Sequence, residues 1–161
     1  MARVLIVGCG CRGQALTREL RVAGHAVRGT TRDLNRREEI EAAGAEAFIG
    51  DPNRVGTITE ALGAVTVMCL LLGSATGTPA QLEALHTTRL EMLLQRTIDT
   101  TVRTVIYEAT GTIDQRILDT GAELVQTKCT HDGVHHTVLR AEPGQWLQQA
   151  LRAIEGALGQ R

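Results

Sequence analysis

The stretch VLIVGCGCRG, residues 4–13, decides the fold of this chain. A short apolar run comes first, and three glycines follow it in the spacing G-x-G-x-x-G at Gly8, Gly10 and Gly13. Residues 14–23 then place apolar side chains at helical spacing opposite a charged face. A strand, a glycine loop and a helix in this order predict a phosphate-binding turn. Gly8 permits the tight turn, Gly10 lets the backbone approach a diphosphate, and Gly13 lets the helix pack closely on the strand.

Short β-branched runs alternate with segments of helical period along the rest of the chain. This alternation predicts an α/β fold: a doubly wound, mostly parallel sheet in three α/β/α layers. The expected strands are 3–7, 26–31, 46–49, 64–72, 102–107, 123–126 and 137–140. The expected helices are 14–23, 35–43, 55–62, 80–100, 113–119 and 145–158. Because no linker or repeat interrupts the pattern, we expect residues 1–161 to form a single domain without a separate substrate domain.

Composition and charge argue against several classes of partner. The 17 basic and 18 acidic residues are interspersed, and no basic block would follow a nucleic-acid backbone. No apolar run reaches the roughly 20 residues of a membrane helix, and the start of the chain lacks the features of a secretory signal. The four cysteines show neither a disulfide framework nor a C-x-x-C pair, which is typical of reduced thiols. We therefore expect a cytoplasmic protein that binds neither nucleic acid nor membrane.

The end of the second expected strand bears on the identity of the ligand. In dinucleotide-binding folds an acid at this place accepts hydrogen bonds from the ribose hydroxyls of NAD. Here the strand ends on Thr30, Thr31 and Arg32, and two hydroxyls with a guanidinium suit a 2′-phosphate dianion. Asp33, one residue later, is the main feature in favour of NAD, and a further alternative is that the arginines of segment 28–37 are ordinary surface residues. The pattern favours NADP(H) over NAD(H).

These residues resemble the atypical short-chain dehydrogenase/reductases, a group that includes the NmrA-like proteins. The resemblance rests on segments 8–13, 24–28, 31–32 and 50–52 and, more weakly, on 105–107, 109–110 and 137–143. It implies a Rossmann-type fold with a bound nicotinamide dinucleotide. Carried over by position, Asp51 contacts the adenine, residues 71–74 line the adenosine and ribose, and Thr110 stands near the place of the catalytic serine.

The glycine loop, the second strand end and the resemblance together give the expected cofactor-binding residues. Arg12 belongs to this set because it could approach the same 2′-phosphate as Arg32. The full set is Gly8, Gly10, Cys11, Arg12, Gly13, Thr30, Thr31, Arg32, Asp51, Leu71, Leu72 and Gly73.

The usual catalytic pair of this family, Tyr-x-x-x-Lys, has no counterpart in the chain. Tyr107 is the only tyrosine, the residue four positions later is Gly111, and the only lysine is Lys128. A lysine that lowers the tyrosine pKa is needed for the phenol to transfer a proton to a carbonyl. The catalytic residues are therefore unknown from the sequence.

Other side chains are weak candidates for proton transfer: Thr110, His131 and His135. The two histidines belong, with Cys129 and His136, to the densest cluster of titratable side chains in the chain. This cluster is interpreted first as a polar loop, second as a general acid/base group and third as a metal site. Because a clear fourth ligand is missing, we predict no metal.

Two functions remain open. The first is a small NADPH-dependent oxidoreductase acting on an unknown small-molecule substrate. The second is a non-catalytic NADP(H) sensor or regulatory binding module of NmrA-like type, which explains the missing catalytic pair. A third, weaker hypothesis is a homodimer in which the leucine-rich helix 80–100 forms the subunit interface.

Overall fold

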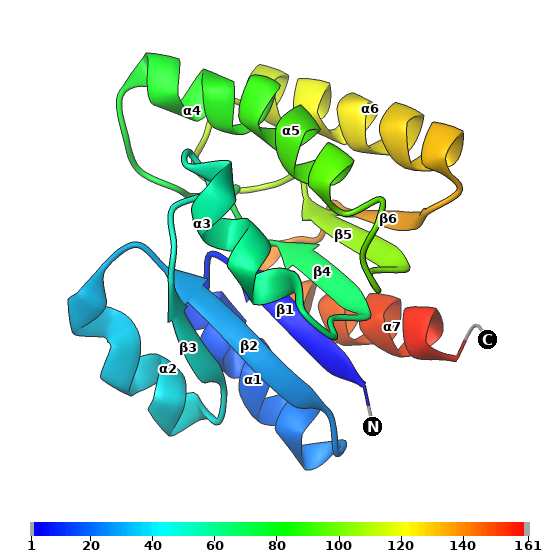
Figure 1. Ribbon diagram of the computed structural model, residues 1–161. Helices are drawn as coiled ribbons and strands as arrows, with labels where there is room; N and C mark the ends of the chain where they lie inside the picture. The colour runs from blue at the N-terminus through cyan, green and yellow to red at the C-terminus, as the bar shows by residue number, and fades with distance from the viewer. Residues whose placement is uncertain (1, 160–161) are drawn as a thin grey trace.

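The computed structural model describes residues 2–159 and contains one six-stranded parallel sheet (Figure 1). The strand order is β3-β2-β1-β4-β5-β6, and every neighbouring pair is parallel. This doubly wound α/β arrangement confirms the predicted fold class. The strands are β1 (Arg3–Val7), β2 (Ala26–Thr31), β3 (Glu46–Ile49), β4 (Val67–Leu70), β5 (Thr104–Glu108) and β6 (His135–Leu139).

Helices cover both faces of the sheet (Figure 1). One face carries α1 (Cys11–Val22), α2 (Arg37–Ala43) and α7 (Trp146–Leu158). The other carries α3 (Val55–Thr59), α4 (Pro79–Leu85), α5 (Thr88–Arg96) and α6 (Gln115–Asp132). Three short 3₁₀ helices complete the chain: η1 (Leu34–Arg36), η2 (Glu60–Leu62) and η3 (Pro143–Gln145).

The core consists of two layers that the sheet separates. Leu5 and Val7 of β1 belong to the layer under α3, α5 and α6, whereas Val4 and Ile6 belong to the layer under α1, α2 and α7. All four side chains are fully buried. A strand with helices on both faces needs apolar side chains at consecutive positions, which is why β1 shows a continuous apolar run.

The predicted long helix 80–100 is wrong, because the chain forms α4 and α5 with a break at His86 and Thr87. The leucine spacing continues across this break, so the periodicity alone does not reveal it. Leu85, Leu90 and Leu93 point into the core of their own chain. These leucines therefore face the chain's own core, and the homodimer stays a prediction.

The predicted strand 123–126 is wrong as well, because these residues lie inside α6. Leu118, Ala122, Val125 and Cys129 of α6 are buried at helical spacing. A four-residue apolar window fits a strand and a helix equally well, and only the longer period decides between them.

A buried polar link holds the loop after β4 in place. His86 is fully buried, with Nε2 3.0 Å from the Leu72 carbonyl oxygen and Nδ1 2.6 Å from the Tyr107 hydroxyl. Because a carbonyl only accepts, Nε2 donates to Leu72, and Nδ1 accepts the hydroxyl proton of Tyr107. Burial lowers the pKa of His86, which keeps this ring neutral.

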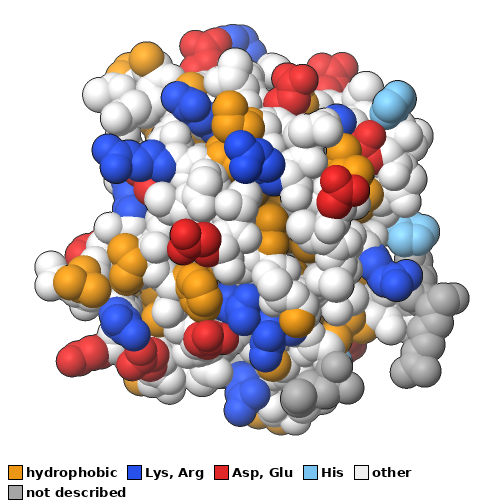
Figure 2. Space-filling model, in the orientation of Figure 1, with side chains coloured by type: hydrophobic (Ala, Val, Ile, Leu, Met, Phe, Trp, Pro, Cys, Tyr) orange, Lys and Arg blue, Asp and Glu red, His pale blue; other side chains and the backbone are white. Residues whose placement is uncertain are grey.

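Basic and acidic side chains are mixed over the face drawn in Figure 2, as their spacing in the sequence predicts. Within residues 2–159, no helix combines the length and the apolar character needed to cross a membrane.

Candidate functional site

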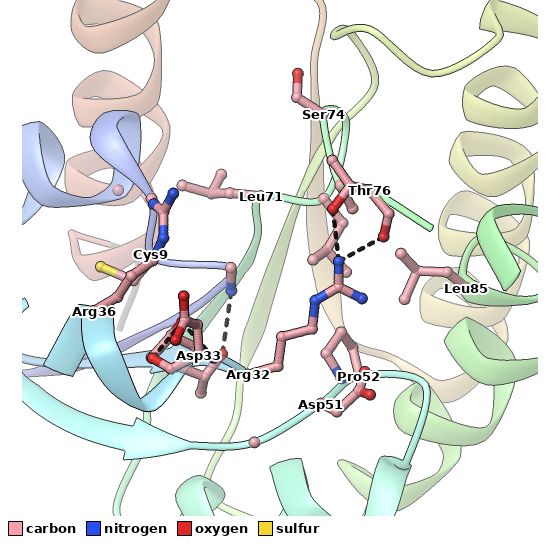
Figure 3. A pocket seen from close by; sticks show the side chains of 18 of the residues that line it. Cys9, Arg32, Asp33, Arg36, Asp51, Pro52, Leu71, Ser74, Thr76 and Leu85 are labelled. Atoms are coloured by element: carbon pink, nitrogen blue, oxygen red, sulfur yellow. Dashed lines mark hydrogen bonds between the residues drawn. The ribbon is translucent and has the colours of Figure 1, made fainter. Parts of the chain in front are cut away.

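A pocket of about 530 Å³ lies at the carboxyl ends of β1, β2, β3 and β4 (Figure 3). In doubly wound sheets this edge holds ligands at the point where the strand order reverses, which here is between β1 and β4. The volume falls in the ~300–1,000 Å³ range of small-molecule sites. All of the predicted cofactor-binding residues line it except Gly73, the residue that follows Leu72 in the chain.

The glycine loop has the geometry of a phosphate cradle. Gly8 has a φ of +87°, and a Cβ atom there would come within 2.6 Å of the Leu71 carbonyl oxygen. A Cβ on Gly13 would come within 3.1 Å of Ile6, so this glycine lets α1 approach β1 closely. A Cβ on Gly10 would meet nothing within 4 Å, and Gly10 provides no side-chain cap for α1. The first-turn amides of α1 are thus suited to bind a diphosphate.

The hydroxyls of the two threonines at the end of β2 accept hydrogen bonds from the backbone, Thr30 from the glycine loop and Thr31 from the turn after β2. The Thr30 hydroxyl accepts a hydrogen bond from the Gly8 amide at 3.2 Å, and the Thr31 hydroxyl accepts one from the Asp33 amide at 3.1 Å. The Asp33 carboxylate in turn accepts from the Asn35 amide at 2.9 Å and caps η1. These groups shape the turn that presents the arginines.

Arg32 reaches across the pocket from β2 to the loop after β4 (Figure 3). Its guanidinium donates to the Thr76 carbonyl oxygen at 2.6 Å and to the Thr76 hydroxyl at 2.8 Å. Arg36 of η1 also lines the pocket, on the side of the glycine loop. No local pattern separates Arg36 from the neighbouring surface arginines, because only the fold shows which of them faces the pocket.

Arg12 lines the same pocket as Arg32, but its contacts lie at the end of β5 and in the loop after β4, so a shared 2′-phosphate stays a prediction. Its guanidinium lies 3.0 and 3.2 Å from the two carboxylate oxygens of Glu108, at the end of β5, and donates to the Ser74 hydroxyl at 3.1 Å. Its Cζ atom lies 5.3 Å from the ring centroid of Trp146. The partner of Arg12 is 96 residues away in the sequence, so no local pattern reveals the pair.

Glu108 is fully buried, and one of its carboxylate oxygens also accepts a hydrogen bond from the Gly73 amide at 2.9 Å. Burial raises the pKa of this carboxyl above its ordinary value, and the Arg12 guanidinium offsets part of the increase. The folded protein therefore retains the Glu108 proton to a higher pH than the unfolded chain does.

This pKa shift predicts a pH dependence of stability. As the pH rises above the ordinary glutamate pKa of 4.5, the free energy of unfolding falls, because the folded state binds the extra proton. The fall ends at the raised pKa of the folded state. We expect the Glu108→Gln variant, which retains an acceptor oxygen for Gly73, to lack this part of the fall. Urea unfolding of both proteins at a series of pH values measures the difference, and parallel curves would contradict the assignment.

The predicted proton-transfer candidates do not meet at this pocket. His135 begins β6 and pairs with Thr104, the first residue of β5, so it lies at the amino edge of the sheet, opposite the pocket. His131 lies near the end of α6 with a side chain that is 83% exposed. Thr110 follows β5 at the correct edge but packs beside Gly73 and does not line the pocket. Within residues 2–159, no three His, Cys, Asp or Glu side chains are grouped as metal ligands.

No protein-family model and no curated protein sequence matches the chain. Solved structures do match its fold. A short-chain dehydrogenase/reductase superfamily protein from Agrobacterium tumefaciens with bound NAD has a TM-score of 0.70 at 18% identity, over 86% of this chain and 48% of that one. UDP-glucose 4-epimerase from Thermotoga maritima has a TM-score of 0.72 at 15% identity, over 86% and 54%. Vestitone reductase from alfalfa, Medicago sativa, has a TM-score of 0.63 at 14% identity, over 86% and 56%.

These comparisons confirm the predicted fold, which is the Rossmann-type fold of short-chain dehydrogenase/reductase and epimerase proteins. The chain spans about half the length of these solved structures. At 14–18% identity the likeness concerns the fold, and the cofactors and substrates of those proteins are theirs.

Proposed function

We propose that this protein binds NADP(H) through the pocket at the carboxyl ends of β1, β2, β3 and β4. The observation that carries the proposal is the pair of arginines, Arg32 and Arg36, which line this pocket next to a glycine loop with phosphate-binding geometry. The first-turn amides of α1 would hold the diphosphate. The two guanidinium groups would hold the 2′-phosphate of the adenosine ribose, because guanidinium matches phosphate in charge and geometry.

The charges around the pocket favour a phosphate over a ribose hydroxyl at the end of β2. Asp33, the nearest acid, already caps η1 through its carboxylate. Arg32 is exposed, and both of its hydrogen bonds go to Thr76, which carries no charge. A 2′-phosphate dianion forms stronger hydrogen bonds with this guanidinium than the threonine does.

Of the two activities that the sequence leaves open, non-catalytic binding fits the structure better. Bound nicotinamide supplies hydride-transfer chemistry, but reduction of a carbonyl also needs a proton donor at the site. The Tyr107 hydroxyl is buried against His86, and Lys128 forms an ion pair with Asp132 at 3.0 Å near the end of α6. Neither side chain lines the pocket. The proposed role is therefore that of an NADP(H) sensor or regulatory module.

Isothermal titration of the purified protein with NADP⁺ and with NAD⁺ tests the proposal. We expect NADP⁺ to bind at least about tenfold more tightly, because one charged hydrogen bond contributes more than the ~1.4 kcal/mol that a tenfold difference requires. The preference should weaken as salt is added, since the contacts are charged and exposed. Equal affinities, or no affinity for either dinucleotide, would contradict the proposal.

A further inference from the structure

We infer that the site takes only the phosphorylated adenosine half of its ligand, and that the nicotinamide half remains outside the protein. The inference rests on the proposed function and adds to it which part of the ligand is recognised. Its basis is that Arg12, Glu108 and Trp146 fill the second half of the sheet's carboxyl edge.

A sheet with this strand order has two mononucleotide-binding halves, one at β1 to β3 and one at β4 to β6. A dinucleotide that lies across the edge needs both. The pocket is lined by the segments after β1, β2 and β3, by Leu71, Leu72 and residues 74–76 of the loop after β4, and by Leu85. Among residues 2–159, none of the pocket-lining residues comes from the segments after β5 or β6. The pocket thus ends at the loop after β4, and the segments after β5 and β6 lie outside it.

Direct contact between two loops closes the second half. A Cβ atom on Gly73 would overlap the Thr110 carbonyl oxygen, and a Cβ atom on Gly111 would overlap the Gly73 carbonyl oxygen. Hydrogen bonds join the same loops, from the Ile113 amide to the Gly73 carbonyl at 3.1 Å and from the Thr112 amide to the Ser74 hydroxyl at 3.2 Å. The crevice between the ends of β4 and β5 is filled by backbone.

Arg12 extends this closure to the glycine loop. Its guanidinium joins α1 to the end of β5 through Glu108 and to the loop after β4 through Ser74. Trp146, the first residue of α7, is 3% exposed and packs against the same guanidinium. The segment that follows β6 thus supplies the tryptophan that completes the barrier.

The electrostatics of Glu108 make this barrier stable. Glu108 is fully buried, and Arg12 is the cationic side chain that contacts it. Moving Arg12 aside for a nicotinamide ribose would leave a buried carboxylate without its counter-charge, which strongly destabilises a folded protein. Protonating the carboxyl is the alternative; it leaves an oxygen that accepts from Gly73 but removes the ion pair with Arg12.

A comparison of ligand fragments tests the inference. We expect adenosine 2′,5′-bisphosphate to bind within about threefold of NADP⁺, because the nicotinamide mononucleotide makes few contacts. We expect 5′-AMP, the matched fragment without the 2′-phosphate, to bind at least about tenfold more weakly than the bisphosphate. If NADP⁺ binds more than about tenfold more tightly than the bisphosphate, the nicotinamide half is bound and the inference is wrong. If none of the three binds, the proposed function fails and the inference fails with it.

The fluorescence of NADPH gives a second, independent readout. A reduced nicotinamide that remains in water should keep its emission maximum and its quenching by iodide when the protein is saturated with NADPH. Transfer into an apolar site would shift the emission to shorter wavelength and protect it from iodide. Such a shift, with binding confirmed by titration, would overturn the inference while leaving the proposed NADP(H) affinity intact.

Discussion

The Arg32→Ala/Arg36→Ala double variant is expected to bind NADP⁺ roughly 100-fold more weakly than the unmodified protein, because two charged hydrogen-bonding groups at ~1.5 kcal/mol or more each are lost. The affinity for NAD⁺ should change by less than about threefold, since its ribose carries no phosphate for the arginines to bind. Isothermal titration with both dinucleotides measures the two affinities. The preference for NADP⁺ should therefore disappear.

Arg37→Ala is the matched control for this variant. Arg37 follows Arg36 directly, but it forms an ion pair with Glu41 on the surface of α2 at 3.0 Å and does not line the pocket. Its removal takes away one positive charge, half of what the double variant loses, one position further along the chain. If Arg37→Ala lowered NADP⁺ affinity as much as the double variant does, the effect would be one of net charge, and the assignment of Arg32 and Arg36 would be wrong.

The Gly121→Ala variant is expected to lose about 3 kcal/mol or more of unfolding free energy, at the upper end of the cost of overpacking a core. The added Cβ atom would overlap the Tyr107 hydroxyl. Tyr107 has no space in which to move, because it is fully buried and donates its hydroxyl proton to His86. Urea unfolding followed by circular dichroism measures the loss.

Gly156→Ala in α7 provides the control, because a Cβ atom there would meet nothing within 4 Å. In an exposed helix position this change should be neutral or stabilise the protein by up to about 1 kcal/mol. Combining Gly121→Ala with Tyr107→Phe should restore part of the lost stability, since the hydroxyl that the Cβ atom overlaps is then absent. A Gly121→Ala variant as stable as the Gly156→Ala variant would show that α6 does not pack on β5 in this way.

Local sequence signals sufficed for the first half of the sheet. The strands β1, β2 and β3 begin and end at the predicted residues, since turn glycines and charged segments separate them from the helices. The second half was harder to predict. There, the break at His86 and the full length of α6 depend on contacts between distant segments, such as the hydrogen bond from Tyr107 to His86.

The candidate site likewise contains residues that local sequence predicts and residues whose contacts depend on distant segments. Gly8, Gly10 and Gly13 were predictable because their function is local, namely a turn and a helix start. The ion pair of Arg12 with Glu108 was not predictable, since Glu108 is remote in the sequence and resembles any other glutamate at the end of a strand. The place of the histidines was not predictable for a related reason: closeness in sequence did not show that His131 and His135 lie at the edge of the sheet opposite the pocket.

The hydrogen bond from His86 to the Leu72 carbonyl changes how mutational data on this protein should be interpreted. Leu72 lines the pocket, but its position depends on the buried imidazole of His86, which bonds its carbonyl. The Tyr107 hydroxyl in turn orients this imidazole. A substitution at His86 or Tyr107 can therefore weaken nucleotide affinity from inside the core, without any contact to the nucleotide. A loss of affinity at either position would reflect a change in the core that supports the pocket wall. Thermal stability should be measured together with binding, because substitutions in the core lower both, whereas substitutions at contact residues lower binding alone.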